Sequence, residues 1–262
     1  MDTIIQILAR ELGRSEAHVE NVVRLIDEGN TIPFIARYRK ELHGAMDDTA
    51  LRTLADRLQY LRNLDKRREE VKSAIEGQGK LTEELSAAID AAATLAEVED
   101  LYRPYKQKRR TRATVAREKG LEPLAELLFA QAADGPAPEE AAGAFVDPEK
   151  GVETAEDALQ GASDIIAERI SDDADIRKRL RELVWKKGSL VSAAAAKEPE
   201  DTVYRLYYAF RSPLNRVQGH QVLAINRGER EGVLKVSVEM EREAALIPVR
   251  RAVLNPGAPA MA

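Results

Sequence analysis

Residues 48–76 read DTALRTLADRLQYLRNLDKRREEVKSAIE, and this stretch decides the fold. Asp47 or Asp48 is suited to begin a helix that reaches about Glu76, which at about 1.5 Å per residue would be on the order of 40 Å long. A helix of this length is longer than a compact domain, so we expect it to be a central helix against which others pack. Its apolar stripe starts with 3-4-3 spacing and continues more loosely, at Leu51, Leu54, Leu58, Leu61, Leu64, Val71 and Ile75.

Three shorter helices are predicted ahead of this central helix. The first covers residues 3–12 and stops at Gly13, and Ser15 is a good N-cap for the second. Gly29 ends the second helix, and Pro33 suits the first turn of a third that runs to about residue 42. Three short helices joined by tight glycine turns predict a helix-turn-helix-like unit at the amino terminus.

Further helices are predicted after the central helix. Thr82 caps one, Thr94 with Glu97 forms a capping box for the next, and residues 120–132 have the pattern of another amphipathic helix. We therefore expect residues 1–132 to form a helical amino-terminal domain.

The second half of the chain is predicted to be helical with minor β structure, so the predicted fold class is a mainly α multi-helix scaffold. Residues 133–151 are rich in alanine, proline, glycine and acid, which predicts a loop. Residues 152–254 predict helices with short strands near 190 and at 233–240. The later strand has few partners, so we expect this region to be incomplete without further carboxy-terminal domains. Residues 255–262 resemble a linker or tail.

Composition excludes several classes of protein. Hydrophobic residues make up 44% and charged residues 32%, as in helix-rich globular proteins, and no apolar run is long enough to span a membrane. Asp2 and Gln6 interrupt the first apolar stretch, which argues against a signal peptide. The chain has no cysteine, so disulfides and cysteine-bound metals are excluded. We expect a cytoplasmic protein.

Charge is distributed unevenly along the chain. The net charge is −5, but residues 101–119 hold eight cations and one acid, whereas residues 134–157 hold eight acids and one lysine. Salt screens charges that lie more than roughly 8–10 Å apart, so a local block of cations can attract phosphates despite the negative total.

This basic block is the first candidate site. Lysine and arginine suit phosphate contacts, and Tyr102 and Tyr105 could stack on bases or sugars. The alternative is a solvated surface that pairs with the acidic stretch 134–157, and the sequence leaves both interpretations open. The candidate nucleic-acid-binding residues here are Arg103, Lys106, Lys108, Arg109, Arg110, Arg112 and Arg117.

A second candidate site follows Pro33. On a helix, Arg37 and Lys40 share one face with each other, and Phe34 shares another face with Tyr38. We interpret the two aromatics as core residues. Arg37, Arg39 and Lys40 remain candidates for phosphate contacts, the alternative being bonds to helix carbonyls or to acids of the central helix.

No catalytic or metal-binding group is evident. His18, His43 and His220 are far apart and lack the spacing of metal ligands. Residues 77–82, GQGKLT, fail the phosphate-loop pattern and are a helix stop followed by an N-cap. No Ser-His-Asp arrangement or carboxylate pair stands out, so we expect a non-enzymatic protein without a cofactor.

Six long segments of the chain have a recognisable family pattern, at residues 29–40, 58–68, 99–112, 116–124, 152–170 and 212–234. These segments resemble the Tex family of bacterial transcription accessory proteins. The resemblance implies a helical region with a helix-turn-helix element, followed in the family by an RNase H-like domain, a helix-hairpin-helix region and an S1 RNA-binding domain.

The resemblance also implies a function. The chain looks like an amino-terminal fragment that stops before the RNase H-like domain, so we expect a scaffold that supports transcription and binds RNA or DNA weakly. The alternative is a protein-interaction module that docks RNA polymerase or another transcription factor without touching nucleic acid. Neither interpretation involves a membrane.

Overall fold

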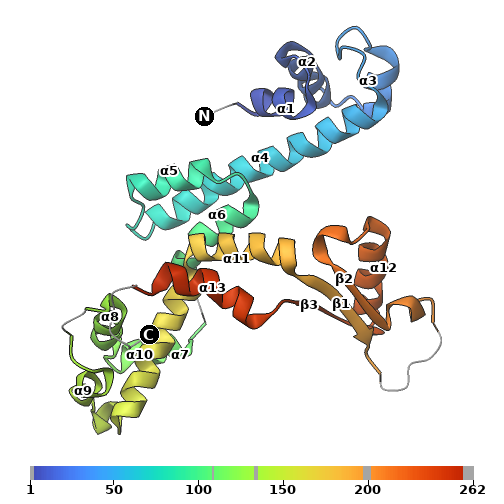
Figure 1. Ribbon diagram of the computed structural model, residues 1–262. Helices are drawn as coiled ribbons and strands as arrows, with labels where there is room; N and C mark the ends of the chain where they lie inside the picture. Colours follow the sequence, from blue (N-terminus) through green and yellow to red (C-terminus); the bar gives the residue numbers. More distant parts are fainter. Residues whose placement is uncertain (1–2, 108, 133–134, 197–201, 256–262) are drawn as a thin grey trace. The chain divides into compact units, whose positions relative to one another are not determined.

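The computed structural model describes residues 3–107, 109–132, 135–196 and 202–255. The chain divides into two compact units, unit 1 (Met1–Tyr105) and unit 2 (Lys106–Ala262). Thirteen α-helices and one three-stranded sheet lie in the described part of the chain, which confirms the mainly α fold (Figure 1). The finer division into domains expected from the sequence stays a prediction.

Unit 1 is entirely helical where it is described. The predicted N-caps are confirmed, because the side chains of Ser15, Asp47, Thr82 and Thr94 each accept a hydrogen bond from a backbone amide in the first turn. The third helix ends at Tyr38, earlier than expected. The helices are α1 (Ile4–Leu12), α2 (Glu16–Asp27), α3 (Ile32–Tyr38), α4 (Asp48–Glu76), α5 (Glu83–Ala91) and α6 (Leu95–Tyr102), followed by a 3-10 turn at Arg103–Tyr105.

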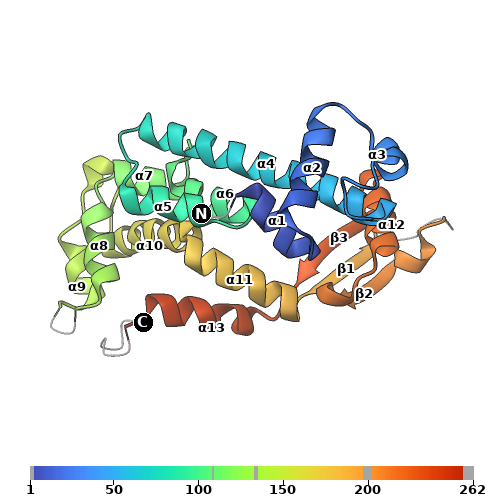
Figure 2. The same cartoon turned by 90° about the horizontal axis from the view of Figure 1, so that it is seen from above.

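Helix α4 is the central helix of unit 1, as predicted. Helices α1, α2, α3, α5 and α6 all contact it (Figures 1 and 2). The seven apolar residues of the predicted stripe, from Leu51 to Ile75, are all buried. Arg68 is buried with them, and its guanidinium donates to Asp65 at 2.6 Å and to the carbonyl of Ala92 at 2.8 Å. The buried Arg68 thus links α4 to the C-terminal end of α5 by a hydrogen bond.

Two ion pairs join α4 to the first two helices. Arg57 donates twice to Glu11 of α1, both at 2.7 Å, and Arg62 donates to both carboxylate oxygens of Asp27 of α2, at 2.7 and 2.8 Å. The hydrogen bonds from Arg57 and Arg62 lower the pKa of Glu11 and of Asp27 below the usual values. A lowered pKa in the folded state means that each carboxylate stabilises the fold once it is ionised.

We therefore expect unit 1 to lose stability as the pH falls through the range where these two carboxyls are protonated. The loss should begin near their unfolded pKa values, about 4.3 for glutamate and 3.9 for aspartate, and be complete below the lowered folded values. In urea denaturation followed by circular dichroism, the variant Arg57→Gln/Arg62→Gln should be less stable at neutral pH and should lose less stability on acidification.

Arg52 provides the control for that experiment. Its ion pair with Asp48 lies within α4 and is more than half exposed on both sides, so Arg52→Gln should leave the pH dependence unchanged. If the free energy of unfolding changed with pH by the same amount in the parent and the double variant, the two interhelical ion pairs would not contribute to the pH dependence.

Unit 2 contains the remaining helices and all the described strands. Residues 133–151 were expected to be a loop, but Pro138–Gly143 form a short helix because Pro138 suits the first turn and Ala141 and Ala142 are buried against α10. The helices are α7 (Arg112–Glu118), α8 (Glu122–Ala130), α9 (Pro138–Gly143), α10 (Ala155–Asp172), α11 (Ala174–Lys187), α12 (Gly219–Arg230) and α13 (Arg242–Val253).

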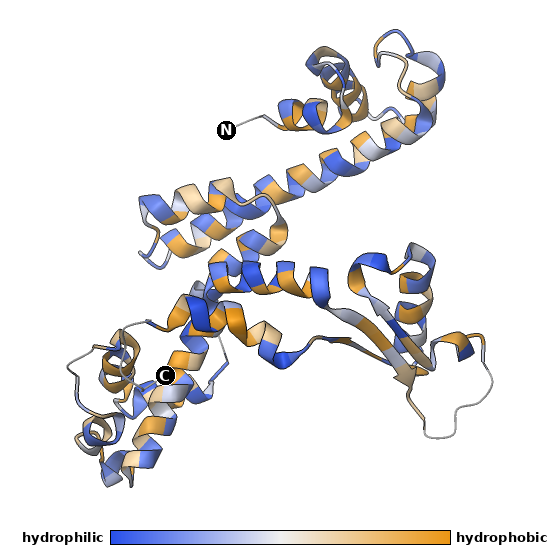
Figure 3. Ribbon diagram, in the orientation of Figure 1, coloured by the Kyte–Doolittle hydropathy of each residue, from blue (hydrophilic) through white to orange (hydrophobic). Residues whose placement is uncertain are grey.

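Small residues let α7 and α10 approach closely. Ala113 and Ala116 of α7 are buried together with Ala158 and Ala162 of α10. Helices α8 and α9 also contact α10, and the buried apolar residues of these four helices form a core separate from that of unit 1. Apolar and polar residues alternate along the helices of both units, as expected for helices with one buried face (Figure 3).

The sheet has the strand order β2-β1-β3, and both pairings are antiparallel. Its strands are β1 (Ser189–Ala194), β2 (Ala209–Pro213) and β3 (Leu234–Glu239). The strands predicted near 190 and at 233–240 are confirmed. The later strand was expected to have few partners, but β3 pairs with β1 along its whole length. Strand β2 was not predicted.

Helix α12 packs against β3, with Ile225 fully buried and Gly228 directly beside Leu234. The phenol of Tyr204 donates to Glu231 at 2.8 Å, and burial together with this bond raises the pKa of Tyr204. In the described part of the chain, no helix is both long and apolar enough to cross a membrane.

Candidate nucleic-acid interface

The predicted binding residues fall in both units. Arg37, Arg39, Lys40 and Arg103 belong to unit 1, and Lys106, Arg109, Arg110, Arg112 and Arg117 belong to unit 2. Lys108 lies outside the described residues. Each set is therefore considered within its own unit.

The first set lies on and just after helix α3. Phe34 and Tyr38 were interpreted as core residues, and this was wrong: their side chains are 37% and 57% exposed. The seven-residue helix buries only Ile35, so its other faces stay open. The two rings lie 5.1 Å apart between centroids, and the guanidinium of Arg39 lies 5.5 Å from the centroid of Phe34. Exposed rings beside a cation form a surface on which bases could stack.

The cations of the α3 cluster, Arg37, Arg39 and Lys40, make weak side-chain contacts or none within unit 1. Arg39 donates to the carbonyl of Tyr38 at 3.5 Å, a long hydrogen bond at the end of α3. Arg37 and Lys40 are exposed, and neither side chain forms a hydrogen bond or ion pair with any residue that the structure describes. Both charges are therefore open to a ligand.

The two tyrosines of the basic block are less available than expected. Tyr102 and Tyr105 are half-buried against the core of unit 1. The guanidinium of Arg67 lies 5.6 Å from the centroid of Tyr102, and the carbonyl of Tyr105 accepts from Gln78 at 2.9 Å. The neighbouring Arg103 is exposed.

Exposed arginines precede and begin helix α7. Arg109, Arg110 and Arg112 are all exposed. Arg110 pairs with Glu118 at 2.6 Å, but both side chains are more than half exposed, and Arg112 lies 3.5 Å from Asp164 with 86% of its own side chain exposed. A surface pair such as Arg110–Glu118 contributes roughly 0–1 kcal/mol, so a phosphate can replace Glu118 at little cost. Asp164 differs, because its side chain is only 16% exposed.

A hollow of about 410 Å³ opens between α7 and α10 beside these arginines. Gly161 and Leu121 lie on its apolar side. Its charged lining is mixed, with the cations Arg110, Arg112 and Lys119 and the acids Asp157 and Asp164. The two acids of the lining disfavour binding of a free anion inside the hollow.

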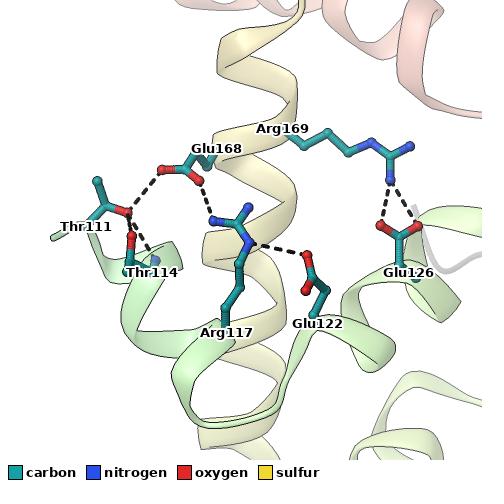
Figure 4. Close-up of polar contacts among 7 residues, drawn as sticks. All are labelled: Thr111, Thr114, Arg117, Glu122, Glu126, Glu168 and Arg169. Carbon is teal, nitrogen blue, oxygen red and sulfur yellow. Dashed lines mark hydrogen bonds and ion pairs between the residues drawn. The ribbon is translucent and has the colours of Figure 1, made fainter. Parts of the chain in front are cut away.

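Arg117 differs from the other arginines because it is held inside unit 2. It donates to Glu168 of α10 at 2.7 Å and lies 3.4 Å from Glu122 of α8, and the hydrogen bond to Glu168 raises the pKa of Arg117 (Figure 4). Glu168 also accepts from Thr111, which caps α7. Arg117 thus joins three helices.

The alternative left open by the sequence, that the basic block pairs with the acids of 134–157, does not describe these arginines. Arg110, Arg112 and Arg117 pair with Glu118, Asp164, Glu122 and Glu168. Glu118 and Glu122 are close to the arginines in the sequence, whereas Asp164 and Glu168 come to them only through the close packing of α7 on α10, which the sequence could not show.

We expect Glu168→Gln to destabilise unit 2 by about 1–3 kcal/mol. The side chain of Glu168 is only 15% exposed and accepts from both Arg117 and Thr111, so an amide would weaken one bond and disturb the other. Urea denaturation followed by circular dichroism measures the effect. Glu126→Gln is the matched control, because Glu126 pairs with Arg169 where both side chains are at least half exposed. Equal effects of the two substitutions would contradict the role assigned to Glu168.

Comparison with known proteins identifies the family of this chain. Residues 2–76 match the Tex-like protein N-terminal domain, and residues 134–254 match the Tex central region-like family. The chain belongs to the Tex family. The family resemblance noted in the sequence is thus confirmed.

Relatives share most of this chain but are much longer. The chain is 49% identical to the uncharacterized protein YdcI of Bacillus subtilis, a match over 89% of the chain and 33% of YdcI. It is 46% identical to protein tex of Bordetella pertussis, over 92% of the chain and 30% of the relative. Human S1 RNA-binding domain-containing protein 1 is 32% identical over 90% of the chain and 24% of its own length. The chain therefore spans about a third or less of these relatives.

Sequence reasoning passed over one strongly basic element of this Tex-family chain. Helix α11, ADIRKRLRELVWKK, carries six cations and two acids, and its Trp185 is 60% exposed. The density of cations within one helix was a signal that could have singled it out. No group of three or more histidine, aspartate or glutamate residues that could hold a metal occurs among the residues described.

Proposed function

We propose that this Tex-family chain is a non-enzymatic scaffold that supports the binding of nucleic acid, RNA or DNA, within a longer transcription accessory protein. The observation that carries the proposal is the run of exposed arginines, Arg109, Arg110 and Arg112, at the start of α7. A helix-turn-helix role for α2 and α3 and a cytoplasmic location are parts of the same proposal.

The electrostatics of this run favour a phosphate ligand. The side chain of Arg109 forms no hydrogen bond or ion pair with any described residue, Arg110 is held only by an exposed pair with Glu118, and Arg112 is itself 86% exposed beside Asp164. A phosphate group offers each guanidinium a bidentate acceptor, and binding also releases counterions from the nucleic acid. The net charge of −5 opposes this attraction only weakly, because distant charges are screened.

The cluster on α3 offers a second kind of contact. Its exposed rings, Phe34 and Tyr38, could stack on unpaired bases, which is worth about 1–3 kcal/mol per base. Arg37 and Lys40 would then contact the adjoining phosphates.

The names of the relatives agree with this proposal. A relative from Neisseria gonorrhoeae, 41% identical, is the transcriptional accessory protein Tex, and the human relative is named for an S1 RNA-binding domain. Docking of RNA polymerase or another transcription factor without nucleic-acid contact is the competing function.

We expect Arg109→Ala/Arg110→Ala/Arg112→Ala to weaken nucleic-acid binding about equally for all sequences. For each phosphate that is no longer bound, the slope of log affinity against log salt should fall by about 0.7 for single strands or 0.9 for duplexes. Fluorescence anisotropy with labelled single-stranded RNA, single-stranded DNA and duplex DNA at several salt concentrations measures both quantities.

The matched control is Arg216→Ala/Arg230→Ala/Arg242→Ala, which removes the same charge from exposed positions elsewhere in unit 2. Equal affinity and salt slope for the α7 variant and the parent would overturn the role of the basic run. Absence of binding by the parent at low salt would favour the protein-docking function instead.

A further inference from the structure

Helices α11 and α13 lie side by side in unit 2 (Figures 1 and 2). Helix α11 leads directly into β1, and β3 leads into α13. Because β1 and β3 are antiparallel neighbours, the two helices also run in opposite directions. This pair is separate from the basic run before α7.

A groove of about 380 Å³ follows the line between the two helices. Its apolar floor includes Leu183 from α11 and Ala244, Ile247 and Pro248 from α13. Ile247 remains 48% exposed, so the floor is open to solvent and not closed by a neighbouring element of unit 2.

The walls of this groove are cationic. They carry Arg179, Lys186 and Lys187 from α11 and Arg251 from α13, with Glu182 as the single acid of the lining. All four cations are exposed, and none of their side chains forms a hydrogen bond or ion pair with another residue in the described ranges. They differ in this from Arg110, Arg112 and Arg117, which have carboxylate partners.

Acids border this groove at the first turn of α11. An adjoining hollow shares Arg179 and Arg251 but is also lined by the acids Asp173 and Asp175. A polyanion would therefore be attracted along the length of the α11–α13 groove and not beyond the first turn of α11.

Part of this charge has a simpler explanation. Lys186, Lys187 and Arg251 lie in the last turns of their helices, where cations stabilise the helix dipole by about 0.3–1 kcal/mol. Arg179 is in the first half of α11 and gains nothing from this effect. Its place opposite the end of α13, beside Arg251, points to a ligand shared by the two helices.

We propose that the α11–α13 groove binds the phosphodiester backbone of a single nucleic-acid strand. Arg179 and Lys186 are seven residues apart, or about 10 Å along the same face of the helix, so the wall cations form a line along the groove and not a single point of charge. Phosphates contact the cationic walls, and sugars lie over the apolar floor. The inference shares the ligand class of the proposed function but uses different residues.

The first test is the variant Arg179→Gln/Lys186→Gln/Lys187→Gln/Arg251→Gln of the 262-residue chain. Glutamine keeps the length and helix propensity of the side chains while it removes their charge. Affinity for a fluorescein-labelled oligouridine should fall about ten-fold or more at low salt, and the salt slope should fall by about 0.7 for each phosphate that the variant no longer binds.

The matched control removes four other exposed cations of unit 2, in Arg216→Gln/Arg230→Gln/Lys235→Gln/Arg242→Gln. It changes the net charge equally but leaves the groove intact, so it should lower affinity much less. Circular dichroism of both variants checks that each is folded.

Crosslinking gives a second readout that does not depend on a change in affinity. The chain has no cysteine, so Ala244→Cys places a unique thiol on the groove floor and Lys235→Cys places one outside it. Each is labelled with a benzophenone maleimide and irradiated with the oligouridine. We expect the RNA to crosslink at residue 244 and much less at residue 235.

The possible results distinguish a failure of the groove proposal from a failure of the proposed function. In one result, the parent binds oligouridine while the groove and control variants bind it with equal affinity and no crosslink forms at residue 244. That result overturns the groove proposal alone. A parent that binds no oligonucleotide at low salt overturns both. Equal losses of affinity for the single-stranded probe and a DNA duplex would contradict the assignment to a single strand.

Discussion

The variant Leu58→Ala/Leu61→Ala is expected to unfold most of unit 1. Both side chains are at most 5% exposed on the face of α4 against which other helices of unit 1 pack. Each truncation of a buried leucine costs about 2–5 kcal/mol, and a typical domain is stable by only about 5–15 kcal/mol. Circular dichroism should therefore show a large loss of helix without denaturant, or a sharply lower urea midpoint.

The opposite face of the same helix supplies the control. Gln59 and Asn63 are exposed and bond each other at 3.0 Å, so Gln59→Ala/Asn63→Ala should change stability by no more than about 0.5 kcal/mol. The single tryptophan, Trp185, lies in unit 2 and reports on that unit by fluorescence. An unchanged urea midpoint in the leucine variant would show that this face of α4 is not the core.

The fold of unit 1 was largely predictable because its signals are local. The leucine stripe of α4 and the caps at Ser15, Asp47 and Thr82 each depend on residues within one or two turns. Phe34 and Tyr38 were misplaced because apolar character alone does not reveal exposure. Helix α3 is too short to bury more than one face.

Unit 2 was harder to predict because its contacts are distant in the sequence. Strand β2 pairs with β1 across a long connection, and the pairing of β3 with β1 spans α12. The basic run of the candidate interface was visible as a charge block, whereas its partners Asp164 and Glu168 depend on how α7 lies against α10. Tertiary packing of this kind leaves no local pattern.

Gly161→Leu is expected to disrupt the packing of α7 on α10. A Cβ atom at residue 161 would overlap Cδ1 of Leu121 and lie 3.3 Å from Cβ of Ala116, and a leucine adds three further carbons there. Overpacking of this kind costs about 1–3 kcal/mol or more. Urea denaturation followed by circular dichroism and by Trp185 fluorescence should show a lower midpoint for unit 2.

Two matched substitutions separate packing from helix propensity. Gly161→Ala should be close to neutral, because alanine favours the helix by about 1 kcal/mol and the flexible end of Leu121 can move aside. Ala167→Leu adds the same side chain at an exposed position of α10 and should also be close to neutral. If Gly161→Leu proved as stable as Ala167→Leu, the close approach of α7 and α10 would be refuted. The arginine run at the start of α7 would then lose the support that presents it to a nucleic acid.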